Sequence, residues 1–308
     1  MRRITYILIF LLSFPFLLIS AELLYPCYKI TEEPIIDGKI EDNVWSSIPA
    51  ATDFYILGKD VYASKQTYFK AGWNKEGIYI AVKCEEPDVE KILAKQPDEG
   101  TLWTEDSIEL FFFPKESDKY FQFVVNAIGS KWNSISSIQL SDWQAKVFVD
   151  GNYWSLEVKI PFEILGRVPE NGEKWAVNIA RNILTCPEER YTCWPPLKSG
   201  FHDISNFGSF IFVETKLDYQ NYLKNKINEI VKYYPEYNEI IEKAIKTPKF
   251  KEEGISLKEN WELAEEVLKK KEASIEELYT VLSKSYNLLQ RVETLKPKIL
   301  LETLFEEE

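Results

Sequence analysis

The chain has 308 residues with 49 acidic and 37 basic side chains, so its formal net charge at neutral pH is -12. Hydrophobic residues make up 45% of it, which is enough for one large domain or two smaller ones with a sizeable core. Nucleic acids and anionic lipid surfaces bind basic proteins, and this acidic chain matches neither. We therefore expect no nucleic-acid partner, and an uncharged ligand is the easier fit.

The N-terminus has the pattern of an export signal. Arg2 and Arg3 precede a nearly unbroken apolar run at 4–19, and Ala21 ends a segment that resembles a signal peptidase site. A transmembrane anchor is the competing interpretation, but the run is shorter than the ~20 residues that span a bilayer. No basic stop-transfer cluster follows it. We expect 1–21 to be a signal peptide and the protein to be secreted, periplasmic or held at the cell surface.

Short runs of alternating apolar and polar residues dominate the next part of the chain. Successive side chains on a strand point to opposite faces, so such runs predict strands with one buried face. Gly151-Asn152 lies between two of the runs and is a hairpin signal. The spacing predicts a mainly β fold, an antiparallel β-sandwich or barrel, over 22–215. The runs lie at 68–73, 78–84, 107–113, 120–126, 143–149, 154–160, 175–183 and 209–213.

Beyond this region the apolar period changes to that of helices, which predicts an α-helical extension over 216–308. Two capping boxes, each a serine followed three residues later by a glutamate, predict helices at 257–271 and 275–293. The simpler interpretation is a helical hairpin that packs on itself or on the sandwich. The alternative is a module that binds a protein partner or a second copy.

Four cysteines in an oxidising compartment allow two disulfides in three connectivities. Cys186 and Cys193 flank a turn-like segment, so we expect a disulfide between them. Cys27 and Cys84 are then left to pair or to stay free. With one histidine in the chain, neither pair of cysteines has the spacing of a zinc site.

Short motifs run through the β region in a fixed order. They are Ile36-Asp37-Gly38-Lys39-Ile40 with Trp45, Trp73 with Gly77-Ile78-Tyr79-Ile80-Ala81, Trp103-Thr104-Glu105-Asp106-Ser107-Ile108-Glu109-Leu110-Phe111, Phe121-Gln122-Phe123 with Asn126, Trp154-Ser155-Leu156-Glu157 with Ile160-Pro161, Trp175-Ala176-Val177-Asn178, and Phe207-Gly208. In this order and spacing the chain resembles the family 9 carbohydrate-binding modules (CBM9) and their bacterial relatives, which adopt a DOMON-like β-sandwich. The resemblance covers roughly 27–213 and leaves out the helical tail.

The resemblance implies sugar binding in a groove lined by aromatic rings. It implies that Trp103 stacks on the sugar and that Glu109 hydrogen-bonds its hydroxyl groups. The second stacking residue of characterised members is a tryptophan, and Phe201 followed by His202 stands at that place here. Val124 stands where some members have an arginine, so the same sugar preference does not follow.

The chemistry of the residues agrees with this resemblance. A pyranose presents apolar C–H faces and a rim of hydroxyl groups, so its site needs flat aromatic surface and a few orienting polar groups. Trp103 and Glu109 supply one of each. Trp103 is alternatively a packing residue, and Glu109 a strand carboxylate satisfied by a neighbouring Arg or Lys. Further candidates are the loop aromatics Trp132 and Trp194 and the hydroxyl-orienting Asn126, Arg181 and Arg190, whereas Trp45, Trp73, Trp154 and Trp175 fit the core.

We expect no required cofactor. Acidic residues at 37–42, and Glu105 with Asp106, offer hard oxygen ligands, and the resemblance implies structural calcium without assigning its ligands. Related sandwiches carry haem ligated by Met and His, but Met1 is the one methionine here and leaves with the signal peptide. We therefore expect no haem.

We expect a non-catalytic protein, because the sequence has no nucleophile elbow, HExxH motif or phosphate loop. If it were an enzyme after all, a hydrolase of O-glycosyl bonds is the nearest class. The sequence predicts an exported accessory protein of polysaccharide breakdown or uptake that binds an oligosaccharide or polysaccharide. The alternative is a structural or interaction protein of the cell surface that uses the sandwich as a scaffold.

Overall fold

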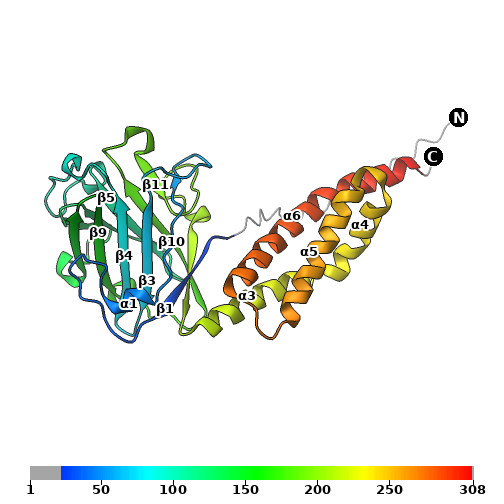
Figure 1. Ribbon diagram of the computed structural model, residues 1–308, viewed down its shortest axis with the longest axis horizontal. Helices are drawn as coiled ribbons and strands as arrows, with labels where there is room; N and C mark the ends of the chain where they lie inside the picture. The colour runs from blue at the N-terminus through cyan, green and yellow to red at the C-terminus, as the bar shows by residue number, and fades with distance from the viewer. Residues whose placement is uncertain (1–21, 307–308) are drawn as a thin grey trace. The chain divides into compact units, whose positions relative to one another are not determined.

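The computed structural model describes residues 22–306 and divides them into two compact units (Figure 1). A β unit runs from Glu22 to Tyr222, and a helical unit contains the chain from Leu223 onward. The expected signal peptide at 1–21 lies outside the described residues. Within the described part of the chain, no helix is both long and apolar enough to cross a membrane.

The β unit confirms the predicted mainly β fold. Its helices are short: α1 (Asn43–Ser46), α2 (Phe162–Leu165), and the 3-10 turns η1 (Val89–Lys91), η2 (Leu102–Thr104), η3 (Leu140–Asp142), η4 (Pro187–Glu189) and η5 (Ile204–Asn206). Its strands are β1 (Leu24–Lys29), β2 (Tyr55–Ile56), β3 (Thr67–Trp73), β4 (Gly77–Glu85), β5 (Ser107–Phe113), β6 (Phe121–Asn126), β7 (Lys131–Asn133), β8 (Gln144–Asp150), β9 (Tyr153–Pro161), β10 (Glu173–Asn182), β11 (Tyr191–Cys193) and β12 (Gly208–Val213).

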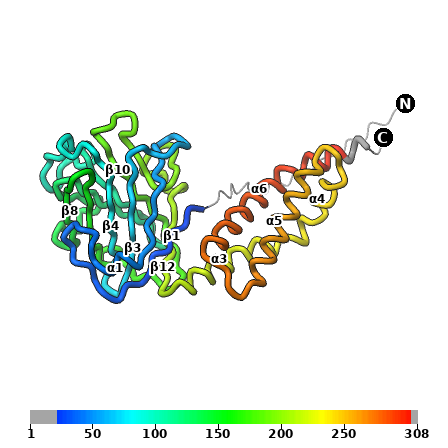
Figure 2. Tube along the Cα trace, in the orientation of Figure 1, coloured from blue at the N-terminus to red at the C-terminus, as the bar shows by residue number. Residues whose placement is uncertain are grey.

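The strands form one hydrogen-bonded sheet that folds over on itself. Its order is β7-β6-β5-β10-β12-β1-β3-β4-β9-β8, with β11 paired to β10 and to β2. β1 is parallel to both of its neighbours, β12 and β3, whereas the other strand pairs are antiparallel. Figure 2 shows β1 beside β12. β1 is therefore the seam between a layer that contains β5, β6 and β10 and a layer that contains β3, β4 and β9.

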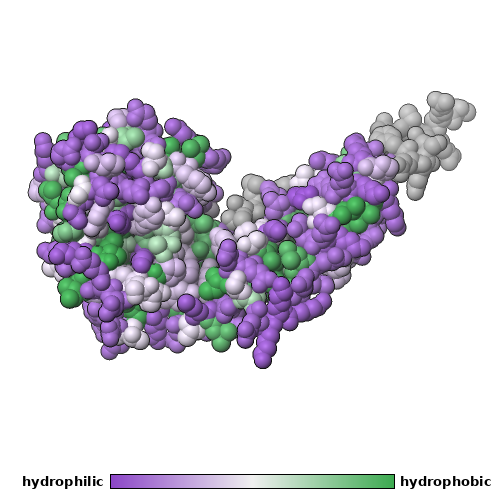
Figure 3. Space-filling view, in the orientation of Figure 1, coloured by the Kyte–Doolittle hydropathy of each residue, from purple (hydrophilic) through white to green (hydrophobic). Residues whose placement is uncertain are grey.

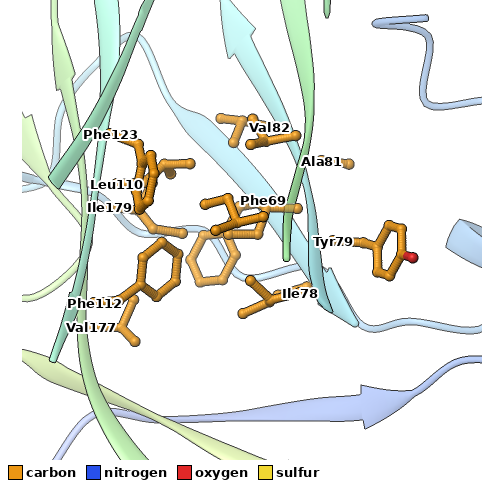
Figure 4. Packing of buried hydrophobic residues seen from close by; sticks show 14 of the residues in the cluster. Phe69, Ile78, Tyr79, Ala81, Val82, Leu110, Phe112, Phe123, Val177 and Ile179 are labelled. Carbon is orange, nitrogen blue, oxygen red and sulfur yellow. The ribbon is translucent and has the colours of Figure 1, made fainter. Parts of the chain in front are cut away.

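The core lies between these two layers. Leu110 of β5 and Val177 of β10 face Phe69 of β3 and Ile78 of β4, and Tyr79, next to Ile78, points away from them (Figure 4). Alternation along each strand explains this arrangement, because every second side chain reaches the interior. The core is a single cluster that draws on both layers. The visible face of the β unit is mostly hydrophilic (Figure 3).

The opposite side chains of β5 and β10 point to the outer face of their layer. Phe111 and Ala180 there join Cys193, Leu197, Phe201 and Phe207 in a second, smaller apolar cluster. Ser107 and Glu109 share this outer face by the same alternation. The predicted Gly151 hairpin is also present, since Gly151 has a φ of 50° between the paired strands β8 and β9.

The helical unit confirms the predicted extension. It comprises α3 (Lys216–Val231), which begins in the β unit, α4 (Tyr234–Lys246), η6 (Pro248–Phe250), α5 (Lys251–Lys269) and α6 (Ile275–Glu306). Helices α4, α5 and α6 pack against one another in pairs (Figures 1 and 2).

The two predicted caps in this unit have different outcomes. Ser274 caps α6 as predicted, because its hydroxyl oxygen accepts the backbone N–H of Glu277 at 3.0 Å. Ser256 lies inside α5 and caps nothing, which corrects the predicted start of that helix. The 3-10 turn η6 begins at Pro248 and leads directly into α5, so the helix starts before the apparent capping box.

Candidate functional site

A cavity of about 460 Å³ opens on the outer face of the layer that contains β5, β6 and β10. The residues that line it are mainly aromatic, amide and charged. They are Leu57, Trp103, Thr104, Glu109, Gln122, Trp132, Asn182, Arg190, Tyr191, Phe201 and His202. Five of the predicted ligand-binding residues therefore come together here: Trp103, Glu109, Trp132, Phe201 and His202. Arg190, a further candidate, lines the same cavity.

Glu109 lies at the centre of β5 and is almost fully buried, with 3% of its surface exposed. One carboxylate oxygen accepts a hydrogen bond from Gln122 Nε2 at 2.7 Å, and the other accepts one from Asn182 Nδ2 at 2.8 Å. Gln122 stands on β6 and Asn182 on β10, the strands on either side of β5. Two amides thus satisfy the carboxylate, and not the neighbouring Arg or Lys expected if Glu109 were a purely structural residue.

The hydrogen bonds to Glu109 leave it able to bind a ligand. A carboxylate has about four lone-pair directions, and the two amides occupy one on each oxygen. Burial raises the pKa of Glu109 above its usual range, and the Asn182 and Gln122 amides offset part of that rise. The ionised form therefore presents its remaining acceptor positions to hydroxyl groups in the cavity.

Aromatic side chains flank Glu109 on two sides within the outer face of the sheet. On one side, Trp103 of η2 and Trp132 of β7 meet edge to face with centroids 5.1 Å apart. On the other side, Tyr191 of β11 and Phe201 meet edge to face at 5.9 Å. Trp103 is 37% exposed and Tyr191 42% exposed, so both keep ring surface free for a ligand. The site thus combines apolar ring surfaces with a central hydrogen-bonding group.

His202 and Arg190 add polar groups near the Phe201 side of the cavity. His202 Nδ1 lies 2.7 Å from the hydroxyl oxygen of Tyr120, and burial lowers the pKa of His202. The histidine is therefore neutral at pH 7 and acts as a hydrogen-bonding group, not as a charge. Arg190 lies over the ring of Tyr191, with its Cζ 5.4 Å from the ring centroid.

The other three predicted ligand-binding residues lie outside this cavity. Arg181 is fully buried and points to the interior, where its Nη2 donates to the Glu85 carbonyl at 2.9 Å and lies 3.4 Å from a carboxylate oxygen of Glu86. It follows Val177 and Ile179 in the inward series of β10, and the outward position belongs to Asn182. Its neighbours make Arg181 a structural residue.

Asn126 and Trp194 are likewise structural. Asn126 is fully buried, its Nδ2 donates to Glu105 Oε2 at 3.1 Å, and its Oδ1 accepts two backbone N–H groups. Trp194 belongs to the core cluster and packs against Phe69 at 5.1 Å and Phe210 at 6.0 Å. It follows strand β11, which turns its ring toward the interior. Neither side chain is available to a ligand.

Gln122, Asn182 and Tyr191 line the cavity although none of them is among the site residues predicted from the sequence. The signal for the first two was present: Gln122 lies between Phe121 and Phe123, and Asn182 follows Arg181 in an alternating strand. Both residues alternate with inward-pointing side chains, so both point to the outer face of the sheet, beside Glu109. Tyr191 carried no such signal, because β11 is only three residues long and its pairing depends on the folded sheet.

The expected disulfide between Cys186 and Cys193 is not formed, and all four cysteines are free thiols. β11 pairs Cys193 with Ala180, whereas Cys186 lies beyond the last pair of the hairpin, at the start of η4. Cys186 and Cys193 are therefore not opposite each other in the hairpin. A disulfide would require their Cα atoms to lie within about 7 Å of each other.

The acidic residues considered for calcium do not fit a calcium ion as they stand. Asp37 and Asp42 each accept a backbone N–H, Asp106 accepts two, and Glu105 accepts two together with the Asn126 amide. In residues 22–306 no group of three or more His, Cys, Asp or Glu side chains gathers to hold a metal. Calcium binding stays a prediction that these carboxylates do not support.

A second cavity, of about 260 Å³, lies on the other layer. Tyr68 and Lys70 of β3, Lys83 of β4 and Tyr153 of β9 help to line it. Lys83 Nζ lies 4.1 Å from the centroid of the Tyr153 ring. Aromatic side chains line this cavity too, so it serves as a control site for binding experiments on the first cavity.

The fold has counterparts among solved structures. A candidate carbohydrate-binding protein from Bacteroides uniformis matches with a TM-score of 0.50 and 18% identity, over 62% of this chain and 98% of that one. A CBM9 from Caldicellulosiruptor kristjanssonii in complex with glucose matches at 0.48 and 17%, over 62% of this chain and 96% of that one. The complex of such a module with cellotriose matches at 0.48 and 18%, over 63% and 94%.

No curated protein shows significant similarity to the chain. The family model described as carbohydrate family 9 binding domain-like matches residues 36–215, which is more than half of the chain and nearly all of the β unit. The fold and this match agree with the resemblance in the sequence motifs. The chain therefore belongs to the carbohydrate family 9 binding domain-like family.

Proposed function

We propose that the β unit binds a carbohydrate, without catalysing a reaction on it, in the cavity around Glu109. Membership of a carbohydrate-binding family supports this proposal. The observation that carries it is the arrangement at the cavity centre, where Gln122 and Asn182 hold a buried carboxylate between two pairs of aromatic rings.

The proposed binding mode follows from the chemistry of sugars. The exposed ring of Trp103 stacks against the apolar face of a pyranose, and Tyr191 with Phe201 closes the opposite side. Glu109 accepts hydrogen bonds from sugar hydroxyl groups through the lone pairs that its amide partners leave free. Glu109 is also the one carboxylate among the described residues that line the cavity, whereas a glycosidase needs a pair of them.

In its wider role we propose an exported accessory protein of polysaccharide breakdown or uptake. Export rests on the pattern of residues 1–21, and the accessory role rests on the absence of a catalytic motif in the sequence. The helical unit is then a candidate for docking a protein partner that supplies catalysis or transport.

Isothermal titration calorimetry of residues 22–308 tests this function. Glucose, cellotriose and a panel of other mono- and oligosaccharides are titrated into the wild type, Trp103→Ala and Tyr153→Ala. We expect saturable heat from at least one sugar and a loss of about 1 to 3 kcal/mol of binding free energy in Trp103→Ala. Tyr153→Ala removes an aromatic ring from the second cavity and should bind as the wild type does.

Each contrary result has a separate meaning. Loss of binding in Tyr153→Ala alone would move the site to the second cavity. Absence of heat with every sugar would refute carbohydrate binding and favour the alternative, a surface protein that uses the sandwich as a scaffold. Circular dichroism of each variant checks that it is folded.

A further inference from the structure

Arg190 differs from the other arginines of the described chain in having no carboxylate partner. Arg167 pairs with Glu173 at 2.7 Å, Arg181 with Glu86 at 3.4 Å, and Arg291 with Glu253 at 3.5 Å. The arginine ion pairs found in residues 22–306 involve Arg167, Arg181 and Arg291 but not Arg190, although acidic residues outnumber basic ones in the chain. An arginine left unpaired in an acidic protein requires an explanation.

One N–H of the Arg190 guanidinium is also removed from water without a hydrogen-bond acceptor. Its Nε is buried and has no hydrogen-bond partner within the described residues, as is also true of the Nε of Arg167 and Arg181, but those two arginines have carboxylate partners and Arg190 has none. A buried N–H that finds no acceptor costs free energy, and native structures retain few such groups unless they serve a function or meet a ligand. A ligand that supplies an acceptor here would recover that cost.

The position of Arg190 is fixed by its surroundings. Its backbone carbonyl accepts the N–H of Ile183 at 2.8 Å, and its guanidinium lies over the Tyr191 ring. The neighbouring carboxylate of Glu189 accepts the backbone N–H of Ser64 at 2.7 Å and so is occupied elsewhere. Arg190 is therefore a pre-positioned cation on the wall of the cavity.

Glu109 and Arg190 are the two charged residues that line this cavity, and burial keeps His202 neutral at pH 7. A planar guanidinium matches a carboxylate with two parallel, charge-assisted hydrogen bonds, which are stronger than the hydrogen bonds that it makes to neutral hydroxyl groups. A ligand carboxylate would avoid Glu109 because of like-charge repulsion and would turn toward Arg190. The two charges therefore also set the orientation of such a ligand.

We propose that Arg190 makes this site selective for saccharides that carry a carboxylate, such as a uronic acid residue. This proposal rests on the proposed function and names the substrate class of the same cavity. The carboxylate lies against the Arg190 guanidinium, and the neutral hydroxyl groups of the sugar face Glu109.

Calorimetry at pH 7 tests the proposal with three ligands: glucuronic acid, its uncharged methyl ester, and glucose. We expect the wild type to bind glucuronic acid about tenfold or more tightly than the ester, since charge-assisted hydrogen bonds are about twice as strong as neutral ones. In Arg190→Gln the preference for the acid over the ester should disappear. Arg190→Lys should keep part of the preference, because it retains the charge but not the planar pair of donors.

The readout is the ratio of the affinity for glucuronic acid to the affinity for its methyl ester, taken within each variant. A substitution that weakens binding of both ligands equally leaves this ratio unchanged. Equal affinities for acid and ester in the wild type would overturn the inference, as would a preference that survives in Arg190→Gln. If glucose binds and the acid binds no better, Arg190 selectivity fails while carbohydrate binding stands. If none of these ligands and no sugar of the wider panel binds, the proposed function itself fails.

Discussion

Replacing Glu109 by glutamine tests the centre of the proposed site with the smallest change in shape. The glutamine keeps one oxygen to accept an amide hydrogen bond, but its NH₂ group faces the second amide donor. Either Gln122 or Asn182 relieves that contact by turning its side-chain amide through 180° and presenting oxygen. The variant should therefore fold, at a cost to the free energy of unfolding of about 1 kcal/mol.

The expected effect on binding is larger. A hydrogen bond to a charged group contributes about 1.5 to 3 kcal/mol and one between neutral groups about 1 kcal/mol, so replacing the carboxylate costs about 1 to 2 kcal/mol for one sugar hydroxyl. This corresponds to a rise in Kd of about 5- to 30-fold. Calorimetry with the tightest-binding neutral sugar of the panel measures the difference directly.

The pH dependence of sugar affinity tests the role of Glu109 independently. The pKa of Glu109 is raised by burial, so the carboxylate takes up a proton at a higher pH than an ordinary glutamate. The affinity of the wild type for a neutral sugar should fall as pH falls through that raised pKa, while the affinity of Glu109→Gln stays flat.

The contribution of Glu109 to folding stability should change with pH in the opposite direction to sugar affinity: it should increase as pH falls. Because the folded pKa lies above the unfolded value, the protonated form favours folding. That contribution is complete below the ordinary glutamate pKa and is lost as pH rises through the folded pKa. A loss of sugar affinity at acid pH therefore does not reflect unfolding caused by Glu109. A Glu109→Gln variant with wild-type affinity and a wild-type pH profile would refute the role given to this carboxylate.

Two further predictions concern the framework. Arg181→Met leaves Glu86 buried with only Lys65 and Thr185 as side-chain partners, so denaturant unfolding should show a loss of about 3 kcal/mol, whereas Lys29→Met at the exposed pair with Glu214 should lose under about 1 kcal/mol. Equal effects would contradict the buried role of Arg181. Gly254→Ala places a Cβ 2.7 Å from the backbone nitrogen of Ile245, so the thermal transition of the helical unit should fall despite the higher helix propensity of alanine, with sugar affinity unchanged. A rise in that transition temperature would show that the two helices separate to admit the methyl group.

The sandwich and the centre of the site were predictable because they depend on alternation. The apolar positions of β5 assign Glu109 to the face opposite the core, and the structure places it there. The same rule, applied along β10, assigns Arg181 to the interior and Asn182 to the cavity. The prediction of Arg181 as a ligand-binding residue rests on its guanidinium chemistry and not on this alternation, and the residue that reaches the cavity is its neighbour Asn182.

Residues in loops and short strands were less predictable, because their direction depends on contacts far along the chain. Trp194 reaches the core only because β11 pairs with β10, and that pairing also keeps Cys193 away from Cys186. The start of α5 depends on the turn that precedes it, since η6 brings the chain into helical geometry before Ser256. Pro248 is a local signal for this earlier start, whereas the pairing of β11 with β10 depends on residues that are not adjacent in the sequence.

The parallel seam has a consequence for biosynthesis. β1, the first strand of the β unit, completes its hydrogen bonds only with β12, the last, and the adjoining residues Lys29 and Glu214 form an ion pair across a separation of 185 residues. Before β12 is made, β1 can pair only with β3, and only at Tyr28 and Lys29, so a nascent chain must hold most of its first strand without a partner until nearly the whole β unit has been translated. Sequence-distant pairing of this kind slows folding. The two layers join only when β12 arrives, and a chain released before that strand has been made has no seam to close.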